Sequence, residues 1–259
     1  MNAWFDNQLH SMNPEYVIFY NNRNIRRKQP ADIILAFRAF CDTLTKEEAS
    51  VVTTFIKSLL NELNLPKASS VLDLACGKGR HSVTLNEFGY RVHGVDLSSQ
   101  SIAHAKKFAN EQLSFAVQDM RVPIEDMKFD AIFNLFTSFG YFSSKLENEK
   151  VCHAMAKMLQ PGGRLVIDFM NTSKVVQNLV PKEIKNVQGI DFNIKREYSG
   201  THIIKYIDFN DQGKQFAFRE QVQAVDLKLF SELLEPYFVV DDVFGSFELE
   251  EYIPLDSER

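Results

Sequence analysis

Residues 71–80 read VLDLACGKGR, and this stretch decides the fold. A short apolar run leads into a turn that holds two glycines, Gly77 and Gly79, and the turn opens a helix. Glycine has no Cβ and accepts positive φ, so the backbone can pass close to a bound small molecule there. The helix behind the turn adds free N–H groups and a partial positive charge. The stretch therefore predicts a strand, a turn and a helix that bind a ligand.

Asp73, just before this turn, indicates which kind of ligand can bind there. A carboxylate at the mouth of the turn repels a pyrophosphate and attracts a cationic or zwitterionic molecule. S-adenosylmethionine has a sulfonium, an amino-acid end and no phosphate, so we expect it as the cofactor, with S-adenosylhomocysteine as its product. The alternative is a dinucleotide-binding turn, but its third glycine is replaced by Ser82, and a G-x-G pair alone is weak evidence.

Polar residues end the strands that follow. Asp96 comes after an apolar run at 91–95, Asp119 after a run at 114–118, and Asn134 lies in a run at 129–135. In open α/β sheets, ligands bind outside the carboxyl ends of the strands. The sequence therefore predicts acidic and amide groups along one ligand-binding edge.

The order of predicted elements gives the fold class. Strands over 70–75, 91–95, 114–118, 129–135 and 164–169 alternate with helical patterns, which predicts parallel βαβ units. We expect an α/β fold: a Rossmann-like, doubly wound, mostly parallel sheet. Three successive strands then predict an antiparallel β-meander inserted after strand five. These three strands cover 189–198, 202–209 and 215–225, and a last strand is expected over 238–243.

Four segments follow from this pattern. We expect an N-terminal helical cap at 1–66, a cofactor-binding α/β core at 67–171, the antiparallel insertion at 172–225, and a C-terminal helix and strand that return to the core at 226–259. Asp226 is expected to cap that last helix, and Pro236 to end it.

Composition excludes several classes of protein. A net charge of −5 argues against a broad nucleic-acid surface, and no apolar stretch is long enough to span a membrane. The first residues have no basic and apolar leader pattern. The three cysteines and the histidines lack metal-ligand spacing. We expect a cytoplasmic protein with no metal and no nucleic-acid or membrane partner.

The chain resembles the class I S-adenosylmethionine-dependent methyltransferases. It carries the Leu-Asp-Leu-x-Cys-Gly-x-Gly-Arg-His-Ser turn of their small-molecule branch at 72–82, and the segment Asn-Leu-Phe-Thr-Ser-Phe-Gly-Tyr-Phe at 134–142. Asp119-Met120-Arg121 and Pro161-Gly162-Gly163 are also present. The resemblance is tight over residues 71–169 and loose elsewhere. Similar proteins with an insertion after strand five include N-methyltransferases of amino sugars and of glycine-like amines.

The resemblance implies where the methionine and ribose parts of the cofactor lie. Asp73 and the backbone of Ala75 and Gly77, in the turn that Gly79 completes, would face the methionine part. Asp96 would accept both ribose hydroxyls, because an ionised carboxylate offers two oxygens. Leu97 would pack on the adenine.

It also implies partners for the two ends of the cofactor. Asp119 would accept the adenine amino group, and the Met120 backbone N–H would meet a ring nitrogen. Asn134 or Leu135 would offer a backbone carbonyl to the ammonium. Tyr16 would close over the cofactor from the N-terminal segment.

The methyl acceptor is expected beyond Asn134. Phe139, Tyr141 and Phe142 would form an aromatic wall, and cation–π attraction could hold an ammonium there. Arg80 and Arg196 are further candidates for substrate contacts. The phenylalanines fit core packing as well, Arg80 fits a solvated side chain, and Arg196 fits a surface strand better than a contact. No catalytic residue is assigned, because methyl transfer from a sulfonium depends mainly on alignment.

The expected activity is methyl transfer to a small molecule, with nitrogen slightly preferred over oxygen. The alternatives are a non-catalytic module that binds the cofactor, a nucleic-acid methyltransferase and an NAD-dependent oxidoreductase. The exposed edges of an antiparallel insertion also allow a homodimer. The family's sheet normally ends with an apolar strand between strands five and six, and the sequence reaches Arg259 without one. Either the sequence is cut short or another segment fills that place, so the strand order at this edge is left open.

Overall fold

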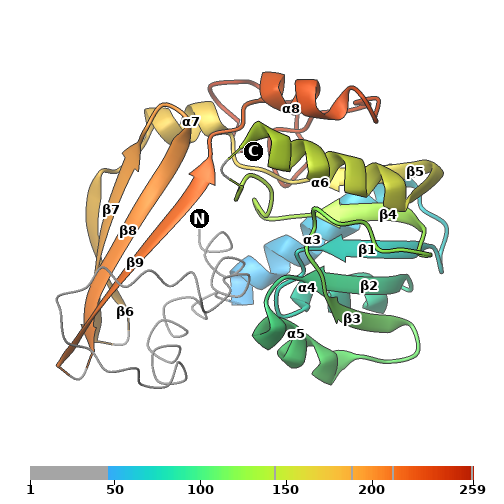
Figure 1. Cartoon of the computed structure of the whole chain (residues 1–259), viewed down its shortest axis with the longest axis horizontal. Helices are drawn as coiled ribbons and strands as arrows, with labels where there is room; N and C mark the ends of the chain where they lie inside the picture. Colours follow the sequence, from blue (N-terminus) through green and yellow to red (C-terminus); the bar gives the residue numbers. More distant parts are fainter. Residues whose placement is uncertain (1–45, 143, 188, 212, 258) are drawn as a thin grey trace.

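The computed structural model describes residues 46–142, 144–187, 189–211, 213–257 and 259, and it contains two β-sheets that lie side by side (Figure 1). The helices are α3 (Lys46–Leu63), α4 (Arg80–Glu87), α5 (Ser99–Ala105), the 3-10 helix η2 (Lys106–Phe108), α6 (Lys145–Met158), α7 (Thr172–Gln177) and α8 (Leu227–Leu234). The strands of the first sheet are β1 (Ser70–Leu74), β2 (Arg91–Asp96), β3 (Leu113–Val117), β4 (Phe129–Asn134) and β5 (Leu159–Ile167). Those of the second are β6 (Lys182–Val187), β7 (Ile190–Tyr198), β8 (His202–Asp211) and β9 (Lys214–Gln223).

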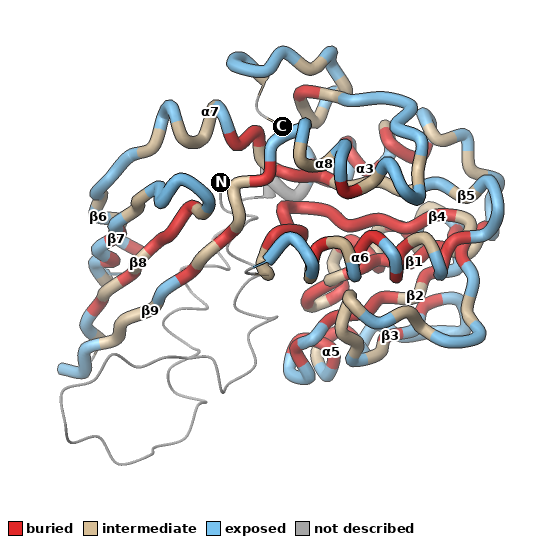
Figure 2. Tube along the Cα trace, turned by 45° about the horizontal axis from the view of Figure 1, so that its top comes forward, coloured by how far each residue is buried: buried red, intermediate tan, exposed pale blue. Residues whose placement is uncertain are grey.

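The first sheet is entirely parallel, with the strand order β3-β2-β1-β4-β5. Successive side chains of a strand point to opposite faces, so β1 contributes to two cores. Val71 joins a cluster with α3, α4 and α5, whereas Leu72 and Leu74 join a second cluster with α6 and α8. Buried residues therefore run through the middle strands of the sheet (Figure 2). The predicted Rossmann-like, doubly wound fold is confirmed.

Local signals placed several helix ends. Ser98 caps α5, because its hydroxyl accepts a hydrogen bond from the Ser101 N–H at 3.2 Å, and Asp226 caps α8 by accepting one from the Leu229 N–H at 2.8 Å. Gly89 follows α4 with a φ of 91°. The helix α5 ends at Ala105 and continues only as η2.

The second sheet is antiparallel, in the order β6-β7-β8-β9, and differs from expectation in its strand count. Sequence patterning predicted three strands over 189–225, and the structure adds β6. The segment KEIKNV of β6 has only two apolar residues, and one of them, Ile184, is 71% exposed. This strand pairs with β7 through its backbone. It lacks the alternation of apolar residues by which a strand is predicted from sequence.

The strand predicted over 238–243 is wrong. The structure assigns no strand there, and the nearest pairing is an isolated bridge between Phe244 and Glu251. The valines that suggested a strand face solvent, with Val239 87% exposed. A cavity of about 980 Å³ is lined both by β5 and by this segment, which Arg164 and Asp241 connect at 2.6 Å. Because the segment does not pair with β5, β5 ends the described parallel sheet.

The two sheets fall within the predicted segments 67–171 and 172–225. The division of the chain into four units stays a prediction, and most of the expected N-terminal cap lies outside the described residues. Within the described residues, none of the helices combines the length and apolar character needed to cross a bilayer.

Candidate functional site

The glycine turn joins β1 to α4 through three residues with positive φ: Ala75 at 65°, Gly77 at 56° and Gly79 at 83°. The Cys76 N–H donates to the carbonyl of Val95 at 2.8 Å, which fastens the turn to β2. A Cβ at Gly79 would lie 2.7 Å from the ring of Phe115. Gly79 is therefore needed for close packing as well as for its left-handed backbone.

Asp73 lies in β1 and is 2% exposed. The Ser82 hydroxyl donates to its Oδ2 at 2.5 Å. Burial raises the pKa of Asp73 to about 6, although the hydrogen bonds from Ser82 oppose the shift. Ser82, at the position of the third glycine in a dinucleotide-binding turn, thus orients a carboxylate that faces the same turn.

Asp96 ends β2 and is equally buried. Its Oδ2 accepts from the Gly77 N–H at 3.0 Å, and its Oδ1 accepts from the Ser98 N–H at 2.8 Å. Burial raises the pKa of Asp96 to about 7; these two N–H groups oppose the rise, and the nearby charge of Asp73 adds to it. The carboxylate therefore bridges the turn and the start of α5.

Asp119 follows β3 and is paired with Arg121, whose guanidinium bonds both carboxylate oxygens at 2.6–3.1 Å. Burial would raise the pKa of Asp119, but the hydrogen bonds and charge of Arg121 outweigh it and hold the pKa below its usual range. Arg121 also contacts Glu147 at 2.7 Å and lies 4.6 Å from the ring centroid of Phe142. Asp119 is thus connected to the loop after β4, and the neighbouring Met120 packs on the core that α6 and α8 share.

Asn134 ends β4 with a fully buried side chain. Its Nδ2 donates to the Leu74 carbonyl at 2.9 Å, whereas its Oδ1 is buried without a hydrogen-bond partner in the described part of the chain. The two carbonyls expected to receive an ammonium already accept one bond each. Asn134 accepts from the Asp168 N–H at 2.9 Å, and Leu135 accepts from the Ser138 hydroxyl at 2.8 Å. Each carbonyl oxygen keeps a second lone pair.

Apolar side chains lie open to solvent next to these polar groups. Leu97, after β2, is 47% exposed, and Val117, which pairs with Asp96 across β2 and β3, is 50% exposed. Such exposed apolar groups at strand ends can cover a flat ring, and burying each would contribute roughly 1–2 kcal/mol.

Asp168 was missed as a site residue, although it follows β5 as the other aspartates follow their strands. It is 6% exposed, and its Oδ2 accepts from the Phe136 N–H at 2.7 Å. Burial raises its pKa, opposed by Arg259 at 3.5 Å. The strand-end pattern used for Asp96 and Asp119 would have found it.

His81 is a second residue to which the sequence gave no role. It lies in the first turn of α4, buried, with its ring stacked on Phe136 at a centroid distance of 4.3 Å. Its Nε2 has no hydrogen-bond partner among the described residues. Burial, with the charge of Arg80, lowers the pKa of His81 to about 3, so the ring is neutral.

The residues predicted to contact the methyl acceptor differ in their surroundings. Phe139 is 1% exposed and packs against Phe230, so its ring belongs to the core. Phe142 lies under the Arg121 guanidinium, and Tyr141 carries a buried hydroxyl without a hydrogen-bond partner in the described ranges. Arg196, on β7, is bound to Glu183 at 2.6 Å.

Two expected residues add less to the described site. Arg80 is the first residue of α4 and is half-buried. Tyr16 lies outside the described residues.

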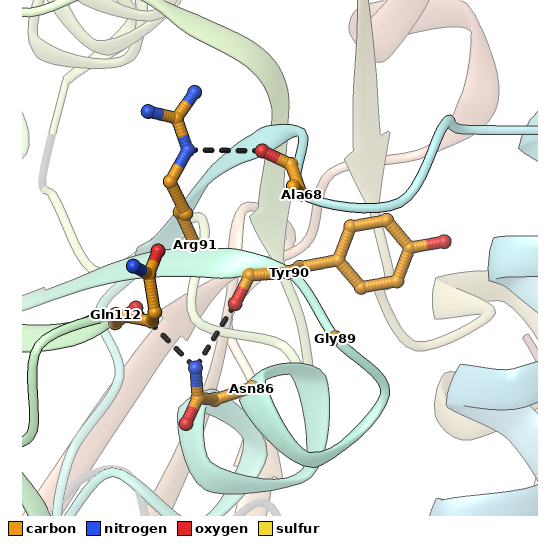
Figure 3. Close-up of a pocket in the computed structure, with 6 residues that line it drawn as sticks. All are labelled: Ala68, Asn86, Gly89, Tyr90, Arg91 and Gln112. Carbon is orange, nitrogen blue, oxygen red and sulfur yellow. Dashed lines mark hydrogen bonds between the residues drawn. The ribbon is translucent and has the colours of Figure 1, made fainter.

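A pocket smaller than the 980 Å³ cavity lies at the edge of the parallel sheet opposite the aspartates. It has a volume of about 450 Å³ and is lined by Ala68, Asn86, Gly89, Tyr90, Arg91 and Gln112 (Figure 3). Asn86 donates to the carbonyls of Tyr90 and Gln112, and Arg91 donates to that of Ala68. Its polar side chains therefore satisfy the backbone, and it lies at the amino ends of β1 and β2, away from the aspartates.

Among the described residues, no group of three or more histidine, cysteine or acidic side chains could hold a metal ion. The polar groups at the carboxyl edge instead suit an organic ligand. Carboxylates, an orphaned amide oxygen and exposed apolar side chains match the hydroxyls, cationic groups and flat base of S-adenosylmethionine.

Comparison with known proteins shows what this part of the chain is similar to. Residues 71–163 match the model of a family described as a methyltransferase domain. The chain is 29% identical over 187 residues to dTDP-3-amino-3,4,6-trideoxy-alpha-D-glucopyranose N,N-dimethyltransferase of Streptomyces venezuelae, covering 70% of this chain and 76% of that protein. It is 30% identical over 146 residues to glycine N-methyltransferase of Rattus norvegicus, covering 50% of each. The chain spans about half the length of most curated relatives that it matches.

The fold is shared with a solved S-adenosylmethionine-dependent methyltransferase from Clostridium acetobutylicum ATCC 824. The TM-score is 0.73 with 22% identity, over 87% of this chain and 96% of that structure. Residues 71–163 are therefore similar in sequence to a methyltransferase domain, and the likeness to the solved structure shows the fold.

Proposed function

We propose that this protein is an S-adenosylmethionine-dependent methyltransferase that methylates a nitrogen of a small molecule. One observation carries the proposal: Asp73 and Asp96 are buried in adjacent parallel strands on either side of a glycine turn. Two buried carboxylates cost free energy unless something compensates them. A ligand with two hydroxyls and a positive charge at this edge compensates both.

The cofactor roles expected from the sequence fit the geometry of the site. Asp96 would accept the ribose hydroxyls while keeping its two backbone bonds, because an ionised carboxylate has about four acceptor positions. Leu97 would cover the adenine. Asp73, with the backbone of Ala75 and Gly77, would face the methionine part.

The remaining cofactor residues lie at the neighbouring strand ends. Asp119 and the Met120 backbone would meet the adenine, and the Arg121 pair leaves Asp119 some acceptor capacity. Asn134 or Leu135 would receive the ammonium of the methionine part through its backbone carbonyl. The side-chain Oδ1 of Asn134 is a further acceptor at this edge.

Methyl transfer requires little covalent chemistry from the protein itself. When bound, S-adenosylmethionine supplies a methyl carbon on a good leaving group, a neutral thioether. The residues of this chain bind both reactants, align them and exclude water, and such alignment can contribute several kcal/mol to the rate. The buried rings of Phe136 and Phe139 make the loop after β4 a rigid, dry support for this alignment.

Nitrogen is preferred as the acceptor because two relatives carry N-methylation in their names, one acting on an amino sugar and one on glycine. A small acceptor also agrees with the net charge of −5, which disfavours a polyanion such as nucleic acid. The acceptor pocket is expected beyond β4, near Tyr141 and Phe142, with Arg80 and Arg196 as further candidates.

Calorimetry with S-adenosylmethionine tests the cofactor. We expect tight binding by the native protein and binding weakened about 100-fold by Asp96→Ala, because two charge-assisted hydrogen bonds to ribose are lost. Glu125→Ala, an exposed carboxylate on the loop before β4, is the matched control and should bind as the native protein does. Native affinity in Asp96→Ala would remove the ribose assignment.

Product formation separates an enzyme from a non-catalytic binding module. A methyltransferase releases S-adenosylhomocysteine when amines are added, whereas a binding module retains the cofactor unchanged. Mass spectrometry of the acceptor then shows whether the methyl group sits on nitrogen or oxygen.

A further inference from the structure

The inner face of the antiparallel sheet carries charged side chains where apolar ones are expected. Lys205 on β8 and Glu220 on β9 are a directly opposed pair, 2% and 3% exposed, with Nζ and Oε2 3.8 Å apart. Their neighbours on the same face include Ile203, Ile207 and Val222, all buried. Burying two charges costs several kcal/mol each unless the geometry compensates well.

Here the compensation is incomplete. Lys205 is beyond hydrogen-bond distance of Glu220 Oε2, which has no hydrogen-bond partner in the described part of the chain. Arg196, opposite Lys205 on β7, lowers the proton affinity of Glu220 from a distance but is bound to Glu183 at 2.6 Å. Glu220 thus keeps a buried oxygen without a donor.

The loop after β4 brings a second unsatisfied group to the strand that carries Glu220. The Gln223 N–H on β9 donates to the Gly140 carbonyl at 2.8 Å, which fixes the loop against the sheet three residues from Glu220. Tyr141 follows, and its hydroxyl is buried without a hydrogen-bond partner in the same described ranges. Burial, with the charge of Glu220, raises the pKa of Tyr141, and the Gly140–Gln223 bond holds this part of the loop beside the strand that carries Glu220.

This loop begins at Asn134, at the edge of the parallel sheet that holds Asp73 and Asp96. An orphaned acceptor and an orphaned hydroxyl therefore lie where the two sheets meet. An ammonium donates three hydrogen bonds and carries the charge that a carboxylate attracts.

We infer that Glu220 and Tyr141 form the subsite for the amino group of the methyl acceptor, a small primary or secondary amine. The inference rests on the proposed function and assigns its substrate class. Glu220 Oε2 holds the incoming ammonium and takes one of its protons: an N–H bond breaks, an O–H bond forms, and the electron pair stays on nitrogen. Tyr141 orients the amine, and the charge of Lys205 opposes protonation of Glu220 between turnovers.

The charged and titratable groups facing Glu220 are Lys205 from β8, Arg196 from β7 and Tyr141 from the loop. Burial raises the pKa of Glu220 to about 7, opposed first by Lys205 and then by Arg196. The apparent second-order rate constant kcat/KM should therefore rise with pH through about 7 as Glu220 ionises.

The test uses three amines, D-glucosamine, glycine and benzylamine, and their hydroxyl counterparts D-glucose, glycolate and benzyl alcohol. We expect transfer to at least one amine and to none of the counterparts. Glu220→Gln should raise the KM for that amine about tenfold or more and abolish the pH limb near 7, because the base and the ion pair with the amine are lost. Tyr141→Phe should raise KM by a smaller factor.

Two control variants account for effects on stability, because Glu220→Gln removes the buried counter-charge that faces Lys205. The double variant Lys205→Gln/Glu220→Gln removes both charges and should show the same loss of amine affinity. Glu197→Gln removes a carboxylate from the opposite face of the same sheet and should leave KM unchanged. Calorimetry of the amine with protein loaded with S-adenosylhomocysteine gives a readout that does not depend on turnover.

The outcomes show whether the subsite or the proposed function is wrong. A native protein that does not bind S-adenosylmethionine contradicts the proposed function itself. Native cofactor binding with native amine KM in the double variant overturns the subsite alone, and leaves the buried pair a purely structural element. Transfer to the hydroxyl counterparts, or to no amine in the set, overturns the assignment of an amine acceptor.

Discussion

The two sheets satisfy their buried charged groups in opposite ways. At the edge of the parallel sheet, Asp73 and Asp96 accept hydrogen bonds from residues of the glycine turn and of the helix starts, namely Gly77, Ser82 and Ser98. In the antiparallel sheet, Lys205 and Glu220 meet only because β8 and β9 pair in one register. Hydrogen-bond donors that belong to a sequence motif can be anticipated from the sequence. The partners in a cross-strand pair are known only once the register of the strands is known. Variants in the two sheets test whether this contrast also holds for the free energy of unfolding.

The largest effect is expected from Lys205→Met. It leaves Glu220 buried without its counter-charge, which costs about 3–5 kcal/mol of unfolding free energy. The double variant Lys205→Met/Glu220→Leu should recover most of that loss, because no unpaired charge remains. Urea denaturation followed by circular dichroism measures both.

Lys195→Met provides the matched control. Lys195 lies on the neighbouring strand β7, pairs with Glu197 at 3.3 Å and is 55% exposed, so its loss should leave the unfolding midpoint almost unchanged. Equal destabilisation by the two lysine variants would mean that burial does not distinguish the pairs.

Gly79→Ala tests the glycine turn against a turn of the antiparallel sheet. Both Gly79 and Gly213 have positive φ, at 83° and 76°, but only Gly79 has a neighbour within 4 Å of an added Cβ. Gly213→Ala should therefore cost only the backbone strain, about 1 kcal/mol. Gly79→Ala should cost about 3 kcal/mol, since the methyl group meets the Phe115 ring.

Thermal unfolding of both glycine variants gives the difference, which isolates the steric part. A Gly79→Ala protein as stable as Gly213→Ala would mean that Phe115 moves aside, and the packing argument for this glycine would fail. Recovery of stability in Gly79→Ala/Phe115→Leu would confirm that the ring is the cause.

The sequence was informative where structure is local. Asp73, Gly77 and Asp96 could be assigned to one edge because each follows an apolar run, and the structure places them together. Asp168 obeys the same rule and was overlooked. The parallel sheet was predictable because helical patterns separate short strands that contain apolar residues.

The antiparallel sheet was less predictable because its information is not local. In β8, Ile203 and Ile204 are adjacent and both buried, so alternation does not say which face Lys205 belongs to. Glu220 lies fifteen positions further along and reads as a solvent-facing charge. The failed strand over 238–243 shows the converse: valines favour a strand, but without a paired neighbour Val239 remains exposed.

The pH dependence of stability tests the buried aspartates. Burial raises the pKa of Asp96 from 3.8 to about 7, so the folded state keeps a proton that the unfolded state releases. Stability without ligand should therefore fall as pH rises between about 4 and 7. Between pH 5 and 8 the native protein should lose on the order of 2 kcal/mol more than Asp96→Asn does.

Asp119→Asn is the control for this measurement. Arg121 holds the pKa of Asp119 below its usual range, so its contribution is present above that range and is lost only at more acidic pH. This variant should keep the native slope between pH 5 and 8. Identical slopes in the native protein and in Asp96→Asn would contradict a raised pKa at Asp96.

The smallest effect is expected from Ser82→Ala, which removes the hydroxyl bonded to Asp73 at 2.5 Å. The unfolding free energy should fall by about 1–2 kcal/mol, because a buried carboxylate loses a donor. Ser231→Ala, whose hydroxyl donates to the Leu227 carbonyl on the exposed surface of α8, should change it by less than about 0.5 kcal/mol.

The Ser82→Ala variant also tests how the position of Asp73 is fixed. If local bonds within the motif hold Asp73 in place, the Ser82→Ala protein should bind S-adenosylmethionine more weakly than its loss of stability alone explains, because an unfixed carboxylate must be ordered by the ligand. Calorimetry at equal folded fraction separates the two effects. An unchanged affinity would mean that the strand and its packing, and not the serine, orient Asp73. In that case the parallel sheet would position its charges as the antiparallel sheet does, through the fold as a whole.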